Sequence, residues 1–205
     1  MLKLGLTGGI ASGKSVVGEI FVKLGAHLIQ ADAVAHSLMQ PGRAVYEEVV
    51  RRFGREILNP DGSINRPRLA EAAFGTPGGP PSRFKELNAI VHPAVIDHEN
   101  QWMEEISRRD PKAIAIVEAA LILESSGADR FDHLVVVTCQ PEQRVQRFAR
   151  RLGISEDTAR AEVARRMAAQ IPDEEKIKAA DFVIDNSGSL DATEQQVRRV
   201  FAALR

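Results

Sequence analysis

Cysteine, aromatic residues and net charge are all scarce in this chain of 205 residues. Its single cysteine, Cys139, excludes an internal disulfide and is typical of a protein from a reducing compartment. Aromatic residues make up only 5% of the sequence, and the formal net charge is −1. Because such a balance provides no overall basic field, we expect no nucleic acid among its partners.

Long hydrophobic runs are also missing. No stretch approaches the roughly 18 apolar residues that suggest a membrane span. The apolar run at the N-terminus is short and is broken by Gly5, Gly8 and Gly9, which argues against a secretory signal peptide. We therefore expect a single domain over residues 1–205, with a cytoplasmic location and no membrane partner. The composition predicts no particular oligomeric state.

Five short apolar runs predict buried parallel strands. They cover residues 2–7, 26–31, 113–118, 133–139 and 181–185. Helical patterns separate most of them, and Pro141 suits the first position of one such helix. Thr193 with Gln196 forms a capping box that predicts the start of the last helix. Strands that alternate with helices predict an α/β fold of three layers, in which a five-stranded parallel sheet is covered on both faces.

The spacing of these strands is uneven. Roughly eighty residues separate the second and third strands, and they contain helical patterns and turn signals of their own. We interpret about 33–112 as an inserted, mostly helical lobe and about 141–180, which is rich in arginine, as a second insertion. Within the lobe, GTPGGPPS at 75–82 is typical of a flexible loop. The core then comprises about 1–32, 113–140 and 181–205.

GGIASGKS at 8–15 has the spacing of a phosphate-binding loop, and it lies between a predicted strand and a predicted helix. Its glycines let successive N–H groups point inward as an anion nest, and the following helix adds its positive end. Lys14 can reach the β- and γ-phosphates of ATP, and the Ser15 hydroxyl can bind Mg²⁺. This context disfavours the alternative of a glycine-rich turn with a surface lysine. The residues we expect to bind the nucleotide are Gly9, Ala11, Ser12, Gly13, Lys14, Ser15 and Val16.

Carboxylates follow two of the strands, at the sheet edge where an open α/β sheet binds its ligands. Asp32 can accept a proton from a substrate hydroxyl or hold Mg²⁺ through water. Equally, it can cap a helix that starts near Ala33. Glu118 ends the third strand and Glu124 follows it, and either can be a solvated or capping acid.

Arg144, Arg147 and Arg151 are spaced by three and four residues, so they share one face of the helix that begins at Pro141. Arg150 lies beside them, and two more arginines, Arg165 and Arg166, follow in the next predicted helix. Such stripes are often solvated faces. Here the stripe starts where a strand ends, next to the phosphate loop, which favours guanidinium groups that close over a transferring phosphoryl group.

An ordered series of segments resembles the dephospho-coenzyme A kinase family over nearly the whole chain. LGLTGGIASGKS resembles its phosphate loop, QADAVAHSLMQPG its signature after the second strand, and FGREILNPDGSINRPRLAEAAF with LNAIVHP its coenzyme-binding lobe. VEAALILE, PEQRVQRFARR and ADFVIDNSG are similar to its third strand, lid and last strand. Other kinases on this core, such as nucleotide or gluconate kinases, share the loop and lid but lack the lobe pattern. A regulatory module that only binds nucleotide needs no acceptor base.

The resemblance implies a phosphate-loop NTPase core with a helical substrate lobe and a lid, and a kinase that uses ATP and Mg²⁺ to phosphorylate the ribose 3′-hydroxyl of dephospho-coenzyme A in the last step of coenzyme A synthesis. It implies that Asp32 is the catalytic aspartate, Lys14 the phosphate lysine and Arg147 the lid arginine that also binds ATP. The sequence departs from the family at three positions. They are Gln30 for an aspartate, His36 for an arginine and Ala120 for a proline. His92 is either a packing residue of the lobe or a substrate contact.

Overall fold

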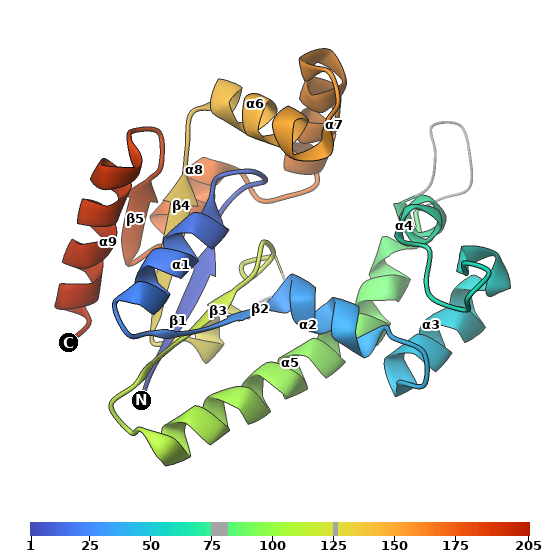
Figure 1. Cartoon of the computed structure of the whole chain (residues 1–205), viewed down its shortest axis with the longest axis horizontal. Helices are drawn as coiled ribbons and strands as arrows, with labels where there is room; N and C mark the ends of the chain where they lie inside the picture. Colours follow the sequence, from blue (N-terminus) through green and yellow to red (C-terminus); the bar gives the residue numbers. More distant parts are fainter. Residues whose placement is uncertain (75–81, 125–126) are drawn as a thin grey trace. The chain divides into compact units, whose positions relative to one another are not determined.

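The computed structural model describes residues 1–74, 82–124 and 127–205. The loop predicted at 75–82 lies outside this range except for its last residue. Five parallel strands form one sheet in the order β2-β3-β1-β4-β5 (Figure 1). They are β1 (Leu2–Thr7), β2 (His27–Gln30), β3 (Ile114–Glu118), β4 (His133–Thr138) and β5 (Phe182–Asp185). The five-stranded parallel sheet predicted from the apolar runs is therefore confirmed.

The chain divides into two compact units, and the sheet belongs to the first of them. Unit 1 comprises Met1–Gln30 and Glu105–Arg205, and unit 2 comprises Ala31–Glu104. The helices of unit 1 are α1 (Lys14–Lys23), α6 (Pro141–Leu152), α7 (Glu156–Ala168), α8 (Asp173–Lys178) and α9 (Leu190–Ala203), with a 3-10 turn η2 (Ala128–Arg130). Figure 1 shows α9 beside the edge strand β5.

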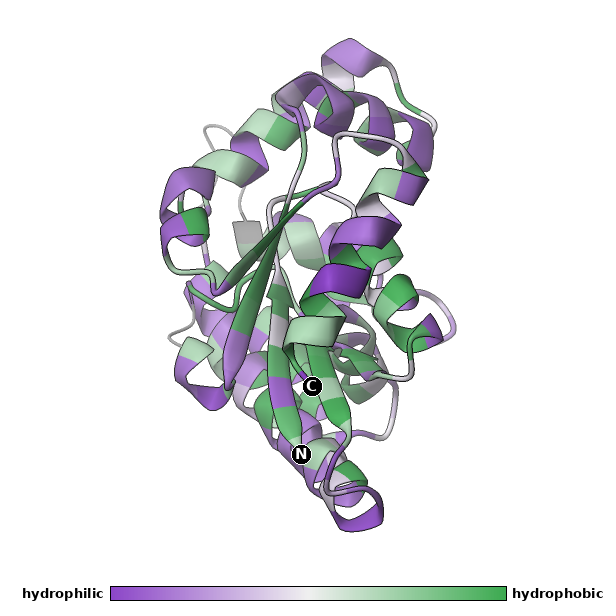
Figure 2. Ribbon diagram, turned by 90° about the vertical axis from the view of Figure 1, so that its left-hand side faces the viewer, coloured by the Kyte–Doolittle hydropathy of each residue, from purple (hydrophilic) through white to green (hydrophobic). Residues whose placement is uncertain are grey.

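Both faces of the sheet are buried within unit 1, and β4 shows this most clearly. Val135 and Val137 point to a core that α1 and α9 complete with side chains such as Phe21 and Phe201. The alternate residue Leu134 joins Val136 in a second cluster on the opposite face. Because side chains alternate along a strand, a strand buried on both faces is apolar throughout. The strands are accordingly green along most of their length in Figure 2.

Unit 2 is mostly helical. Its elements are α2 (Ala31–Leu38), α3 (Ala44–Phe53), a 3-10 turn η1 (Arg55–Ile57), α4 (Arg66–Phe74) and α5 (Phe84–Arg109), of which the last turn lies in unit 1. A hydrophobic cluster that includes Val49, Phe53 and Leu69 holds α3 and α4 together. An isolated antiparallel bridge between Leu58 and Ile64 closes the turn that connects them. Helices therefore fill the interval between β2 and β3, as its sequence pattern predicts.

Two helix starts test the sequence predictions. Helix α6 begins at Pro141, as predicted. The predicted capping box at Thr193 is wrong, because α9 begins at Leu190 and the Ser189 side chain accepts the backbone N–H of Ala192. Thr193 lies inside the helix, and its hydroxyl donates to the side-chain oxygen of Asn186. None of the helices in the described ranges is both long and apolar enough to cross a membrane.

Candidate active site

The segment between β1 and α1 curls tightly at its glycines. Gly8 and Gly13 have φ values of 151° and 93°, and Ala11 has a φ of 54°. A Cβ on Gly8 would lie 2.3 Å from the carbonyl oxygen of Val137, so the close approach of β4 requires glycine there. Gly13 is the residue before α1, so the loop leads directly into the positive end of that helix. This is the strand–loop–helix geometry that the motif predicts.

Lys14 and Ser15 leave this loop in different directions. The Lys14 ammonium donates to the carbonyl oxygens of Gly8 and Gly9, at 3.0 and 3.2 Å, so its side chain folds back over the loop. The Ser15 hydroxyl donates to Glu118 Oε1 at 2.8 Å. Glu118 ends β3 and is buried, so it is neither solvated nor a helix cap. A hydroxyl beside a carboxylate offers the oxygen ligands that Mg²⁺ prefers.

Gln30, at the end of β2, completes this arrangement. Its side-chain amide donates to Glu118 Oε2 at 3.0 Å. An aspartate, which is usual at this position in the family that the sequence resembles, would place a second carboxylate near Glu118, and like charges disfavour each other in a buried site. The amide instead satisfies the carboxylate. The departure at Gln30 therefore fits the neighbour that this chain has on β3.

On its other side the loop is held by Arg147 and Asn186. Arg147 donates from Nη1 to the Ser12 carbonyl at 3.3 Å and from Nη2 to the Asn186 carbonyl at 2.8 Å. The buried Asn186 side chain donates to the same Ser12 carbonyl at 2.9 Å and accepts from the Thr193 hydroxyl at 2.9 Å. Sequence reasoning missed Asn186, although the segment DNSG, which starts at the last residue of β5, was a signal for it. These bonds tie α6, α9 and the end of β5 to the phosphate loop.

The predicted arginine stripe splits in two. Arg144 and Arg147 both lie on the loop, and Arg144 is 1% exposed. Arg151 is exposed, and its guanidinium lies 5.3 Å from the centre of the Phe148 ring. Similarly, Arg165 and Arg166 on α7 both pair with Glu162. The solvated-face interpretation therefore holds for the later arginines and fails for Arg144. Arg150 is also exposed.

Two further buried groups lie in unit 1. Glu124 pairs with the fully buried Lys176 at 2.8 Å and accepts the backbone N–H of Ile171 at 3.1 Å, so it is not a solvated acid. Lys176 had no signal in the sequence.

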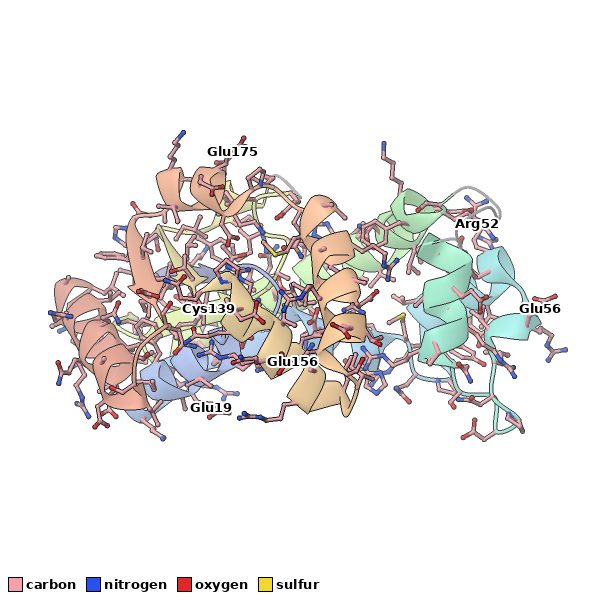
Figure 3. The ribbon with its side chains drawn as sticks, turned by 90° about the horizontal axis from the view of Figure 1, so that it is seen from above. Glu19, Arg52, Glu56, Cys139, Glu156 and Glu175 are labelled. Carbon is pink, nitrogen blue, oxygen red and sulfur yellow. The ribbon has the colours of Figure 1, made fainter. Side chains whose placement is uncertain are left out.

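Burial raises the pKa of the Cys139 thiol, which leaves it neutral and unsuited to act as a nucleophile. Figure 3 labels Cys139 inside unit 1, whereas Glu175 projects from its edge.

Asp32 lies in the first turn of α2, in unit 2. The helix begins at Ala31, so the interpretation of Asp32 as the cap of a helix that starts near Ala33 is wrong. The side chain is exposed and makes no hydrogen bond to any residue in the described ranges. His36 is exposed on the same helix and contacts Gln40, and His92 is half-buried in α5. Asp32 thus follows β2 by two residues and has its carboxylate available.

The glycine-rich loop at the end of the central strand β1, with Lys14 over it and Ser15 beside a buried carboxylate, defines the class of the chain as a phosphate-loop NTPase fold. The chain belongs to the dephospho-CoA kinase family, whose model matches residues 2–192.

Individual relatives support this assignment over the full length. A dephospho-CoA kinase from Corynebacterium efficiens is 40% identical over 205 residues, which covers 100% of this chain and 98% of the relative. A solved structure of a Thermus thermophilus protein is 33% identical with a TM-score of 0.77, and it covers 100% of this chain and 98% of that one. The solved dephospho-CoA kinase from Campylobacter jejuni is 25% identical with a TM-score of 0.60, covering 98% and 96% of the two chains.

Proposed function

We propose that this chain transfers the γ-phosphoryl group of ATP to the ribose 3′-hydroxyl of dephospho-CoA, which yields CoA and ADP. The observation that carries the proposal is the phosphate loop, in which Lys14 bonds to two loop carbonyls and Ser15 to Glu118, in a chain that the family model matches over residues 2–192. Phosphoryl transfer needs mainly positioning and charge stabilisation, and this loop is suited to both.

Lys14 and Arg147 are the cations proposed to meet the phosphates. Both now donate to backbone carbonyl oxygens of the loop. Anionic phosphate oxygens make stronger, charge-assisted hydrogen bonds than carbonyls, so bound ATP would draw these donors toward itself. Because charge on the phosphoryl group rises in the transition state, the lid arginine contributes to kcat as well as to binding.

The pair of Ser15 and Glu118 is the proposed Mg²⁺ site. The Ser15 hydroxyl and the buried Glu118 carboxylate, 2.8 Å apart, fit a hard cation that keeps several of its waters. When bound, Mg²⁺ neutralises charge on the β- and γ-phosphates. Glu118 would orient the Ser15 oxygen toward the ion, and Gln30 would hold Glu118 in turn.

The acceptor half of the reaction is assigned to Asp32 and unit 2. The Asp32 carboxylate is exposed and without a hydrogen bond among the described residues, as a base that must receive a substrate hydroxyl should be. Dephospho-CoA is a long molecule with an adenosine end and a pantetheine arm, and a separate compact unit offers surface for both. Binding of the remote arm can then orient the ribose hydroxyl.

The proposal is tested by ADP release in the purified protein with Mg²⁺ and ATP, with and without dephospho-CoA. The expected result is ADP release that requires the acceptor, with CoA identified by its mass. ADP release that is equal with and without dephospho-CoA would indicate a nucleotide hydrolase or a regulatory module. Release stimulated only by gluconate or a nucleotide would indicate another kinase on the same core.

A further inference from the structure

Arg144 is buried against the phosphate loop. It lies in the first turn of α6 and is 1% exposed. A Cβ built on Gly9 would lie 1.8 Å from Arg144 Nη1 and 3.0 Å from its Cζ, so the guanidinium occupies the space that any other side chain at residue 9 would need. The absence of a side chain at Gly9 is therefore what admits Arg144 to the loop.

The hydrogen-bonding capacity of Arg144 is only partly used. Nη2 pairs with the carboxylate of Asp173, the first residue of α8. Nε and Nη1 are buried and have no partner among the described residues. A guanidinium has five N–H donors, and leaving charged donors buried without partners is costly. These two donor atoms would be satisfied by an acceptor on a bound ligand.

Two other cations of unit 1, the buried Lys176 and the half-buried Arg147, differ in this respect. The ammonium of Lys176, which is fully buried, is bound by Glu124 and by Gln170 Oε1 at 3.1 Å. Arg147 donates from both terminal nitrogens to carbonyl oxygens. A cation that serves only to hold the fold would be satisfied as Lys176 is. Arg144 is not.

The surroundings of Gly9 indicate which kind of ligand would satisfy Arg144. Its carbonyl accepts from the Lys14 ammonium at 3.2 Å, and its Cα faces Arg144 Nη1. Two cations from distant parts of the chain thus meet at one glycine, with the single carboxylate of Asp173 against Arg144. Like charges repel in a buried site unless an anion accompanies them. A polyphosphate, which offers several anionic oxygens to a loop of this kind, would satisfy both cations.

We propose that Arg144 is a second guanidinium contact to the terminal phosphates of the bound nucleotide, with Asp173 as the residue that positions it. The identification of the nucleotide as ATP rests on the proposed function. Arg144 donates to the phosphate through Nε and Nη1, while the bond from Nη2 to Asp173 fixes the plane of the guanidinium. Arg147 and Arg144 then approach the nucleotide from the same helix, one turn apart.

The test is the affinity for the non-hydrolysable analogue β,γ-imido-ATP with Mg²⁺, measured by calorimetry for Arg144→Gln. The expected loss is roughly tenfold to a hundredfold, the range for charge-assisted hydrogen bonds removed from a buried anion. Arg160→Gln is the matched control, because it removes an exposed arginine of α7 that pairs with Glu142 on α6, the helix that also carries Arg144. We expect Arg160→Gln to bind the analogue as the wild type does.

If Arg144 only stabilises the fold, Arg144→Gln lowers the unfolding temperature of the nucleotide-free protein and leaves the affinity for the analogue unchanged. That result overturns the proposal. If Arg144→Gln does not fold, the double variant Arg144→Met with Asp173→Leu replaces the ion pair by apolar side chains, an exchange that proteins often tolerate. A folded double variant with wild-type affinity overturns the proposal, and one with the expected loss supports it.

The result is separable from the proposed function. A wild-type chain that binds the analogue in an Arg144-dependent way, yet does not phosphorylate dephospho-CoA, would uphold the role of Arg144 and refute the choice of acceptor. A wild-type chain that does phosphorylate dephospho-CoA, with Arg144→Gln unchanged in affinity, would do the reverse.

Discussion

The surroundings of the phosphate loop in unit 1 and the helical lobe of unit 2 use their polar side chains differently. Around the loop, buried side chains engage one another, as Glu118 does with Ser15 and Gln30. In unit 2 the ion pairs lie on the surface, as those of Glu86 with Arg83 and Arg52 do. Buried polar networks position groups within narrow limits, whereas exposed pairs contribute little to stability. The proposed donor site is therefore preorganised, and the lobe is held together mainly by its hydrophobic cluster.

The largest effect should come from Lys14. We expect Lys14→Ala to abolish measurable phosphoryl transfer, because it removes the cation proposed to bind the β- and γ-phosphates and leaves the core intact. The unfolding temperature should stay close to that of the wild type. Lys23→Ala, at the exposed end of the same helix, is the control and should turn over normally. Near-normal turnover in Lys14→Ala would refute the assignment of the loop.

Asp32 is the one residue of unit 2 from which we expect an effect of similar size. Asp32→Asn should lower kcat by roughly 10²–10⁴, the usual contribution of a positioned general base, and should leave ATP affinity unchanged. Glu48, a half-buried carboxylate paired with Arg51 and Arg52, provides the control, since Glu48→Gln removes a charge from the same unit. If Asp32→Asn changes thermal stability alone, the role of Asp32 is structural, and unit 2 does not supply the general base.

Arg147 tests the lid side of unit 1. We expect Arg147→Ala to lower kcat by roughly 10²-fold and to raise the KM for ATP by less, since the guanidinium meets phosphoryl charge most fully in the transition state. Steady-state kinetics at saturating acceptor distinguish the two parameters. A change in salt-dependent stability with kcat unaltered would show that Arg147 only braces Ser12 and Asn186.

Glu118 tests the opposite side of the loop. Glu118→Gln keeps the side-chain shape but removes the charge beside Ser15, so the Mg²⁺ concentration for half-maximal activity should rise by roughly tenfold. A titration of activity against Mg²⁺ measures this shift, and excess Mg²⁺ should restore much of the lost rate. An unchanged Mg²⁺ dependence would remove Glu118 from the metal site.

The smallest effect is expected from Glu86, on the surface of unit 2. The Arg83 guanidinium lowers the pKa of this carboxyl through a hydrogen bond. The stability that the pair contributes is therefore present above the ordinary glutamate pKa of about 4.3 and is lost as the pH falls through the lowered value. Glu86→Gln should unfold at a slightly lower temperature than the wild type at neutral pH, and the two curves should converge in acid. A large difference at neutral pH would contradict the comparison of the units.

Local sequence patterns predicted the strands, the helices and the phosphate loop. They did not predict the long-range contacts between side chains around the site. The strands and the phosphate loop follow from apolar runs and glycine spacing, which are properties of neighbouring residues. The burial of Arg144 and the exposure of Arg151 depend on which part of α6 meets the loop, and helical spacing alone makes them equivalent. The pairing of Lys176 with Glu124 joins residues far apart in sequence.

The cap of α9 shows the same limit at short range. Ser189 and Thr193 both precede plausible helical residues, and the second also has a glutamine three positions later. The Thr193 hydroxyl is instead used by the Asn186 side chain, which is itself bound to the phosphate loop. The hydroxyl that the sequence pattern assigned to a cap is therefore engaged in a tertiary contact, and Ser189 caps the helix.

The central claim is that unit 1 provides the donor site and that the acceptor is dephospho-CoA. Its most direct test is kcat/KM for dephospho-CoA against adenosine, AMP, gluconate and shikimate, measured with saturating ATP and Mg²⁺. We predict the highest value for dephospho-CoA, and for adenosine a loss in kcat as well as in affinity, because the truncated acceptor lacks the remote arm that orients the hydroxyl. A small acceptor that equals or exceeds dephospho-CoA would contradict the account.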